Sequence, residues 1–327
     1  MISCQVVAES WEFNEPFAIA RAVATEQPLI HVRLTDSLGR TGQAEAAGVD
    51  YDGETVATMI EQVRGFESRF AQPVDYLTLQ EYLPRGGARN ALDCALWDLR
   101  AKQAGVPVWQ AARLPVPRPL LTAYTLGLGT AAEIRRKARV AKGYPLLKLK
   151  VNAQRHLDIV SIVREEQPGA RLIVDANESW SMDLLEELLP AFVAAGVELI
   201  EQPLACGADA CLQGFDSPIP LAADESCTDR ASLGGLVGTY QYVNIKLDKC
   251  GGFTEALATA DEANRLGFGL MVGNMCGTSL GMAPAFLIGQ RCRYVDLDGP
   301  LLQRLDRDAP MKFAGPIIHG PTPALWG

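Results

Sequence analysis

The sequence predicts an α/β fold in which a closed parallel barrel of strand–helix units follows an N-terminal α+β domain. From about residue 118 onward, short β-rich runs alternate with stretches of helical apolar spacing. The polar residues that end these runs recur every 22–28 residues, about the length that a strand, a helix and two short loops need. The first 117 residues lack this period, so we expect two differently built domains.

The N-terminal domain is predicted from strand-like segments that precede helical ones. Residues 3–10, 29–36 and 41–48 are strand-like, and the turn sequence DSLGR joins the second to the third. The clearest helix is ARNALDCALWDLRAKQAG at 88–105, with Gly105 as its stop signal.

A group of prolines marks the domain boundary. We therefore expect an α+β domain over 1–117 and the barrel over 118–312. The tail FAGPIIHGPTPALWG, 313–327, is expected to pack back on the first domain. The boundary prolines are Pro115, Pro117 and Pro119.

Eight β-rich runs predict the barrel strands, each followed by a helical stretch. Intervening segments such as SMDLLEELLPAFVAAG and FTEALATADEANRLG have helical spacing and end at glycine. Chemistry in such barrels lies at the C-terminal ends of the strands, where these runs carry polar residues. The runs are LLTAYTLG, LLKLKVN, ARLIVDANE, VELIEQPL, IPLAADES, YQYVNIKLDK, FGLMVGNM and RYVDLDGP.

Composition and charge are those of an ordinary globular protein. The chain has 327 residues, 48% hydrophobic and 21% charged, with a net charge of −9. It has no basic run, which argues against a nucleic-acid partner. Its eight cysteines form no CxxC pair and it has three histidines, so we expect reduced thiols in a cytoplasmic protein and no zinc site.

Targeting and membrane segments are also unexpected. The first 15 residues contain acidic side chains and no basic region before an apolar core, so they do not resemble a signal peptide. Residues 266–290 carry no charge after Arg265 and contain GxxxG spacings, which a membrane helix could explain. Internal glycines, Asn274 and Pro284 favour a buried strand, a tight loop and a short helix instead.

Lys148 and Lys150 end the second run, two residues apart. Side chains at this spacing in a strand point to one face, and two ammonium groups repel each other unless negative charge lies near. A solvated strand edge is the ordinary explanation. Strands of a parallel barrel are covered on both faces, however, which places the pair in the site.

Three acidic residues, Asp175, Glu201 and Asp224, end the next three runs. Three converging carboxylates cannot all ionise in a pocket without a cation. Because this ligand set contains oxygen and no His or Cys, Mg²⁺ is the expected ion. The alternative is that these acids simply pair with lysines of the barrel.

Lys246 ends the sixth run, with Asn244 two residues earlier on the same face. In a ring of eight strands the second and sixth are opposed, so Lys150 and Lys246 would flank one substrate carbon from opposite sides. A proton could leave one face and return to the other, which is epimerisation. Mg²⁺ would stabilise the enediolate, Lys148 would act as a fixed positive charge beside it, and both would lower the pKa of the base Lys150.

Taken together, these motifs resemble the muconate-lactonising subgroup of the enolase superfamily. The matching sequences are KLK at 148–150, DAN at 175–177, EQP at 201–203, ADES at 223–226 and NIKLDKCGG at 244–252. The resemblance covers essentially the whole chain. It implies a modified TIM-type (β/α)7β barrel under an N-terminal capping domain. ARNALDCALWDL at 88–99 and FAIAR at 17–21 also resemble the dipeptide epimerases of that subgroup.

Asp296 and Asp298 on the eighth run extend this resemblance to the substrate. The pair resembles the ammonium-binding DxD of dipeptide epimerases, and it would lie across the ring from Glu201. A dipeptide spans about 7 Å, which suits a pocket with a metal-bound carboxylate at one end and an ammonium at the other. The alternative is a structural carboxylate pair that caps a helix or loop.

The resemblance implies further substrate contacts. Arg21, in a loop near 17–26 expected to close over the barrel, would pair with the side-chain carboxylate of a C-terminal Glu. It is otherwise a surface arginine. Thr125, Asn274 and Cys276 would line the pocket.

We therefore expect an Mg²⁺-dependent dipeptide epimerase, an isomerase that acts on L-Ala-D/L-Glu in murein peptide metabolism. N-acylamino acid racemase and o-succinylbenzoate synthase on the same scaffold remain alternatives, and so does a non-catalytic structural barrel. The sequence leaves a homo-oligomer open.

Overall fold

The N-terminal part begins with a three-stranded antiparallel sheet. A computed structural model describes residues 2–327 and gives the strand order β1-β2-β3, with β1 Ile2–Ala18, β2 Val23–Asp36 and β3 Thr41–Ala46. The predicted strands are confirmed, but β1 and β2 extend much further than expected. Only residues 19–22 lie outside the strands at their hairpin end.

Helices cover this sheet, and α3 makes the closest contact with it. α3 spans Gly87–Ala104 and ends at Gly105 in the left-handed conformation, with φ 67°, as predicted. Gly42 on β3 lets α3 approach, because an added Cβ would lie 2.3 Å from Ala95 O. The other elements are η1 Asp50–Asp52, α1 Val56–Phe66, η2 Glu67–Ala71, α2 Tyr76–Tyr82 and α4 Val108–Ala111.

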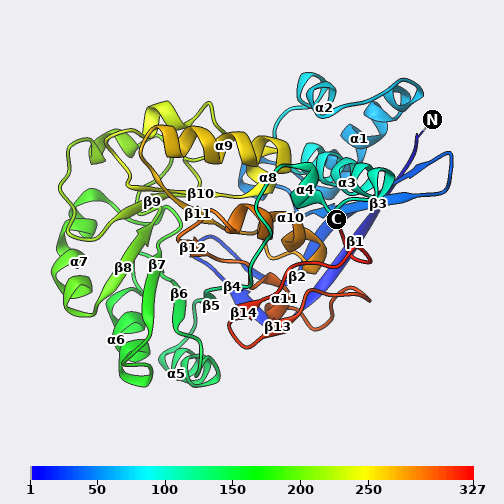
Figure 1. Cartoon of the computed structure of the whole chain (residues 1–327). Helices are drawn as coiled ribbons and strands as arrows, with labels where there is room; N and C mark the ends of the chain where they lie inside the picture. Colours follow the sequence, from blue (N-terminus) through cyan, green and yellow to red (C-terminus); the bar gives the residue numbers. More distant parts are fainter. Residues whose placement is uncertain (1) are drawn as a thin grey trace.

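The second part is an eight-stranded parallel sheet in the order β12-β11-β10-β9-β8-β7-β6-β5 (Figure 1). The main chain closes the ring beside β5 and β12, where Ala123 N donates to Val295 O over 2.7 Å. The predicted barrel is therefore confirmed. Its strands are β5 Tyr124–Leu126, β6 Leu146–Lys150, β7 Arg171–Asp175, β8 Val197–Glu201, β9 Leu221–Ala223, β10 Tyr242–Ile245, β11 Gly269–Val272 and β12 Tyr294–Val295.

Helices follow most of these strands, but the expectation of a helical unit after every strand is wrong for β8 and β9. Only the 3-10 turns η3 Asp209–Leu212 and η4 Leu233–Leu236 follow them. Three prolines lie in the connection after β8 and three glycines in the connection after β9, and both residue types disfavour a helix interior. The remaining helices are α5 Ala131–Val140, α6 Leu157–Glu166, α7 Met182–Ala194, α8 Leu247–Cys250, α9 Phe253–Arg265, α10 Ser279–Gly289 and α11 Gly299–Leu302.

The uncharged segment 266–290 folds as the strand β11, a loop and the helix α10, as expected. Across residues 2–327, no helix is long and apolar enough to cross a membrane. All eight cysteines are free.

The tail runs from the barrel to the first domain. β13 Phe313–Ala314 and β14 Ile317–Ile318 form a small sheet with β4 Leu120–Leu121. The last residues then lie against α3. Trp326 Nε1 donates to Cys94 O over 3.0 Å, and Gly327 N donates to Asp98 Oδ1 over 2.7 Å.

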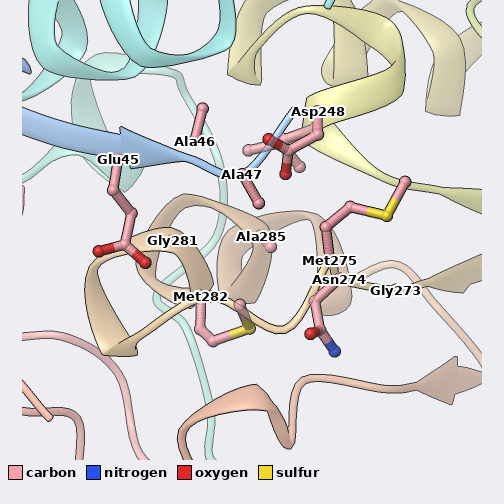
Figure 2. Close-up of a pocket in the computed structure, with 12 residues that line it drawn as sticks. Glu45, Ala46, Ala47, Asp248, Gly273, Asn274, Met275, Gly281, Met282 and Ala285 are labelled. Carbon is pink, nitrogen blue, oxygen red and sulfur yellow. The ribbon is translucent and has the colours of Figure 1, made fainter. Parts of the chain in front are cut away.

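Glu45 on β3 joins the two parts of the molecule. Figure 2 shows its side chain beside the first turn of α10, at Gly281. The buried Glu45 carboxylate accepts hydrogen bonds from Thr278 N over 2.6 Å and from Arg307 Nη2 over 2.5 Å. A Cβ on Gly277 or Gly281 would lie 2.7 or 2.9 Å from Glu45 Oε1. The GxxxG spacing of this segment thus makes room for a carboxylate.

Candidate active site

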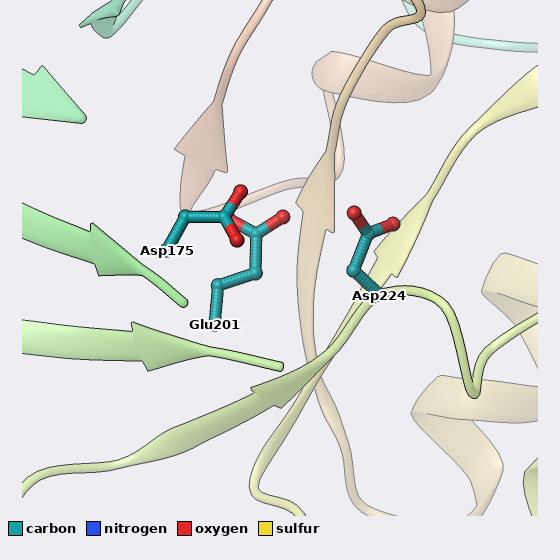
Figure 3. A group of neighbouring side chains, drawn as sticks. All are labelled: Asp175, Glu201 and Asp224. Carbon is teal, nitrogen blue, oxygen red and sulfur yellow. The ribbon is translucent and has the colours of Figure 1, made fainter. Parts of the chain in front are cut away.

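Three carboxylates converge at the C-terminal ends of adjacent barrel strands. Asp175 and Glu201 are the last residues of β7 and β8, and Asp224 directly follows β9. All three are fully buried, and each offers an oxygen within 4.8 Å of the others (Figure 3). Glu201 Oε2 accepts no hydrogen bond of good geometry, although Lys148 Nζ lies 2.8 Å from it. Three carboxylates buried this close together repel one another when they are ionised, so this arrangement favours a bound cation.

Lys148 and Lys150 both face this cluster. Lys148 Nζ lies 3.0 Å from Asp175, 2.8 Å from Glu201 and 2.9 Å from Asp296. Lys150 Nζ lies 2.6 Å from Asp175 alone. The solvated strand edge is therefore excluded for both lysines, because their exposed fractions are 1% and 8%.

Lys246 approaches the same cluster from the opposite side of the ring. It directly follows β10, four strands away from β6, and its Nζ lies 2.6 Å from Asp224 Oδ2. Lys150 and Lys246 both line one cavity of about 260 Å³ between the barrel mouth and the first domain. Asn244 Nδ2 donates to Glu201 Oε1 over 2.8 Å.

Lys249 also contacts the carboxylate cluster, which the sequence did not lead us to expect. Its fully buried Nζ lies 2.6 Å from Asp224 Oδ1 and 3.0 Å from Asn244 O. Each carboxylate oxygen of Asp224 is therefore paired with a different lysine. Within the quoted NIKLDK motif, the three-residue step from Lys246 to Lys249 across the turn into α8 was the available signal.

These contacts shift the pKa values of the acids in opposite directions. Burial and Asp175 raise the pKa of Glu201 to about 8. Burial also acts on Asp175, but Lys150 and Lys148 outweigh it and lower the pKa of Asp175 to about 2. For Lys246, burial is outweighed by Asp224, so the pKa of the ammonium lies above its ordinary value.

Asp296 and Asp298 lie just beyond β12 and are both buried. Asp296 accepts from Lys148 over 2.9 Å, and Asp298 Oδ2 accepts from Thr125 N over 2.6 Å. Burial and the nearby Asp296 raise the pKa of Asp298 to about 8. Asp296 thus already has a cation as its partner, whereas Asp298 accepts a hydrogen bond from a main-chain amide. Thr125 contacts this pair and does not line the 260 Å³ cavity.

Arg21 lies in the 19–22 turn and reaches the barrel. Its Nη1 lies 2.7 Å from Glu225 and 2.9 Å from Glu178, and its guanidinium lies 4.8 Å from the centre of the Tyr51 ring. Arg21 is therefore more than a surface arginine. A substrate carboxylate would share it with two carboxylates of the barrel.

Asn274 and Cys276 lie in the loop after β11 and line the cavity. Asn274 Nδ2 donates to Asp296 O over 2.7 Å, and Asn274 Oδ1 accepts from Cys276 N over 2.6 Å.

Two family descriptions match most of the sequence. Residues 1–111 match the mandelate racemase/muconate lactonizing enzyme N-terminal domain, and residues 129–319 match the enolase C-terminal domain-like family. The chain belongs to the enolase superfamily. The expected capping domain and modified barrel of that superfamily are therefore confirmed.

Relatives of this superfamily member are epimerases and racemases, which are isomerases. The chain is 37% identical to the L-Ala-D/L-Glu epimerase of Escherichia coli, over 98% of this chain and 100% of the relative. It is 41% identical to an N-acetyl-D-glutamate racemase from a Pseudoalteromonas species, over 88% and 91% of the two chains.

Solved structures of the superfamily give the same picture. An Agrobacterium tumefaciens enolase family member with homology to dipeptide epimerases, solved with sodium and L-Ala-L-Glu, has a TM-score of 0.97 and 39% identity, with full coverage of both chains. An Enterococcus faecalis dipeptide epimerase, solved with Mg and L-Leu-L-Tyr, has a TM-score of 0.91 and 25% identity, over 98% and 97% of the chains. The resemblance to dipeptide epimerases is confirmed.

The residues of this superfamily member fit a hard divalent cation. Asp175, Glu201 and Asp224 offer only oxygen ligands, which Mg²⁺ prefers. Glu201 Oε2 accepts no hydrogen bond of good geometry and is therefore available to a metal ion. Lys148, Lys150 and Lys246 contact these acids, so the pairing that the alternative to a metal site described is also present.

Proposed function

We propose that the protein is an Mg²⁺-dependent dipeptide epimerase that inverts the α-carbon of the C-terminal residue, with L-Ala-D/L-Glu as its substrate. One observation carries the proposal. Two lysines from opposite sides of the ring line the same cavity beside three buried carboxylates. This arrangement suits removal of a proton from one face of a carbon and its return to the other. The relatives named as dipeptide epimerases support the substrate class.

In this mechanism Asp175, Glu201 and Asp224 hold the ion, and Lys150 and Lys246 move the protons. A bound Mg²⁺ would supply positive charge beside the substrate carboxylate, where the negative charge of the enediolate develops. The lysines must be neutral part of the time to act as bases. Each is ion-paired here with one carboxylate of the cluster, and sharing that carboxylate with a cation would weaken the pair and favour the neutral amine.

Two groups of residues would recognise the two ends of the dipeptide. Asp296 and Asp298 would bind the ammonium of the dipeptide, with Thr125, Asn274 and Cys276 around them. Lys148 would stay charged beside the developing enediolate, because burial is outweighed by Asp296 and Glu201 and its pKa lies well above the ordinary value. Arg21 would bind the carboxylate of a glutamate side chain. The cytoplasmic location, the role in murein peptide metabolism and a homo-oligomeric assembly stay predictions.

A second candidate function is racemisation of N-acetylglutamate. The 41% identity to an N-acetyl-D-glutamate racemase favours it. The state of Asp298 also supports it, because a carboxyl with a pKa of about 8 is largely protonated at neutral pH and could donate a hydrogen bond to an acyl oxygen. An N-acyl group carries no ammonium for these acids to bind.

Comparing free and N-acetylated substrates separates the two functions. A charge-assisted hydrogen bond contributes about 1.5–3 kcal/mol, so N-acetylation of L-Ala-L-Glu should lower kcat/KM by about 100-fold. Asp298→Asn should bring the kcat/KM values of the free and the acetylated substrate closer together. If Asp298 were purely structural, Asp298→Asn would lower the stability of the fold and leave the ratio of kcat/KM for free and N-acetylated substrate unchanged. Turnover of N-acetyl-L-glutamate at or above the rate of L-Ala-L-Glu would overturn the dipeptide assignment.

A further inference from the structure

Gln202 directly follows Glu201 and has an unusual backbone. Its φ is 35°, a left-handed value that residues other than glycine seldom adopt. Its side chain is completely buried. Such conformations persist only where the surroundings hold them, and they are frequent at functional sites.

The Gln202 main chain joins the three turns that carry the metal-ligand candidates. Gln202 N donates to Ala222 O over 2.8 Å, next to the strand end that leads to Asp224. Gln202 O accepts from Glu178 N over 2.9 Å, in the turn after Asp175. The third ligand, Glu201, is its covalent neighbour.

The Gln202 side chain extends this connection where strand β9 ends. Gln202 Oε1 accepts from Asp224 N over 2.9 Å and from Ser226 N over 3.2 Å. β9 ends at Ala223, so the amide oxygen takes the position that a neighbouring strand would otherwise fill. The main chain of Asp224 is thus held by a side chain.

The amide nitrogen has only acceptors around it. Gln202 Nε2 lies 2.9 Å from Leu204 O, 3.0 Å from Ser226 Oγ and 3.2 Å from Tyr240 Oη. The hydroxyl groups of Ser226 and Tyr240 both donate to Asp209, over 2.9 and 2.5 Å, so their oxygens are free to accept. Two main-chain N–H groups on one side and these acceptors on the other fix the orientation of the amide.

We propose that Gln202 is a positioning residue for the metal site, which sets the placement of Asp224 relative to Glu201. The inference rests on the proposed metal-dependent function. Because Mg²⁺ demands nearly ideal octahedral geometry, a ligand turn that can shift binds it less tightly. Residues that orient metal ligands typically change metal affinity by 10–100-fold when they are replaced.

A matched control is Gln241, whose side chain bonds to the opposite end of β9. Gln241 Oε1 accepts from Leu221 N over 2.8 Å at the start of β9, the end away from the carboxylates. Gln241→Met removes a side-chain hydrogen bond at the start of β9, whereas Gln202→Met removes the two that hold the Asp224 turn just beyond its end.

The experiment is Mg²⁺ titration of wild type, Gln202→Met and Gln241→Met by calorimetry, with kcat/KM measured against Mg²⁺ concentration. We expect Gln202→Met to raise the Kd for Mg²⁺ by about 10–100-fold, with activity recovering at high Mg²⁺, and Gln241→Met to stay within about twofold of wild type. If Gln202→Met does not fold, Tyr240→Phe, which removes one acceptor of the amide, should raise the Kd by several-fold.

A folded variant at Gln202, or Tyr240→Phe in its place, that binds Mg²⁺ with the wild-type Kd would overturn the positioning role and leave the proposed function intact. An equal loss of affinity in Gln241→Met would also overturn it, because any weakening of β9 would then suffice. A wild type that binds no Mg²⁺ would overturn both proposals.

Discussion

Lys150 and Lys246 have matching surroundings although they come from opposite sides of the barrel. Each ammonium lies 2.6 Å from one carboxylate of the cluster, and both line the same cavity. The exposed fractions of the two lysines are 8% and 6%. Neither lysine could replace the other, because each would reach only one face of a bound substrate.

Single replacements of these lysines should therefore separate epimerisation from proton exchange. Lys150→Ala and Lys246→Ala should each lower the epimerisation rate by at least about 100-fold. Each variant should still exchange the α-proton of one stereoisomer with D₂O, which NMR can follow. Near wild-type epimerisation in either variant would contradict the two-base mechanism.

Glu201 should make the stability of the metal-free protein depend on pH. Its pKa is about 8 in the folded chain against an ordinary value of 4.5. Between these two values the folded state keeps a proton that the unfolded state releases, so the contribution of Glu201 to stability is lost as pH rises from about 4.5 through 8.

The free energy of unfolding, measured with urea from pH 5 to 9 without metal, should fall more steeply in wild type than in Glu201→Gln. Saturating Mg²⁺, which binds the ionised carboxylate, should remove this difference in slope. Parallel curves for the two metal-free proteins would show that Glu201 ionises in the folded chain at its ordinary pKa.

The residues that sequence alone could identify are those at strand ends. Lys150, Asp175, Glu201 and Asp224 end or directly follow successive strands, and Lys148 lies two residues before the end of β6, so the barrel period brings them together. Other contacts of the site are made from turns, whose conformation the repeating pattern of strands and helices does not predict. Lys249 reaches Asp224 from the first turn of α8, and Gln202 reaches it through a left-handed backbone.

Among the elements, α10 is fixed at its N-terminus by carboxylates from two other parts of the chain. Glu45 of β3 accepts from Thr278 N, and Asp306, four residues after α11, accepts from Ser279 N over 2.9 Å. Negative charge at this end of a helix is favourable. Because the loop before α10 carries Asn274 and Cys276, these carboxylates also anchor one wall of the cavity.

Glu45→Gln should therefore destabilise the whole fold. The change removes the buried carboxylate that Arg307 contacts, while Arg307 keeps its pair with Glu9, so we expect a loss of about 2 kcal/mol in the free energy of unfolding by urea. The matched control is Glu262→Gln, which breaks an exposed pair with Arg265 and should cost less than about 1 kcal/mol. Equal losses in the two variants would show that the buried pair contributes no more to the free energy of unfolding than the exposed pair does.

Strand and helix boundaries were less predictable than strand order. The polar residue at the end of each β-rich run identifies its strand, and the parallel order follows from the alternation with helices. The connections after β8 and β9 are about as long as the others, but the first contains three prolines and the second three glycines, and they form only 3-10 turns. β12 contains only Tyr294–Val295, so Asp296 and Asp298 are oriented by the loop that follows it.

For the molecule as a whole, the first domain completes the site that the barrel begins. Arg21 and Tyr51 from the first domain line the same cavity as Lys150 and Lys246 from the barrel. Sequence patterns could place each of these residues in its own domain. The contacts of Arg21 with Glu178 and Glu225 depend on how the domains meet, which local patterns do not encode.

The most direct test of the proposed epimerisation is proton NMR of L-Ala-L-Glu incubated with the wild-type protein and Mg²⁺ in D₂O. The two-lysine arrangement predicts that L-Ala-D-Glu appears, that deuterium enters the α-position of the glutamate residue in both epimers, and that the α-proton of alanine is retained. A dipeptide that keeps its glutamate α-proton and its configuration would contradict the assignment of this site as a dipeptide epimerase.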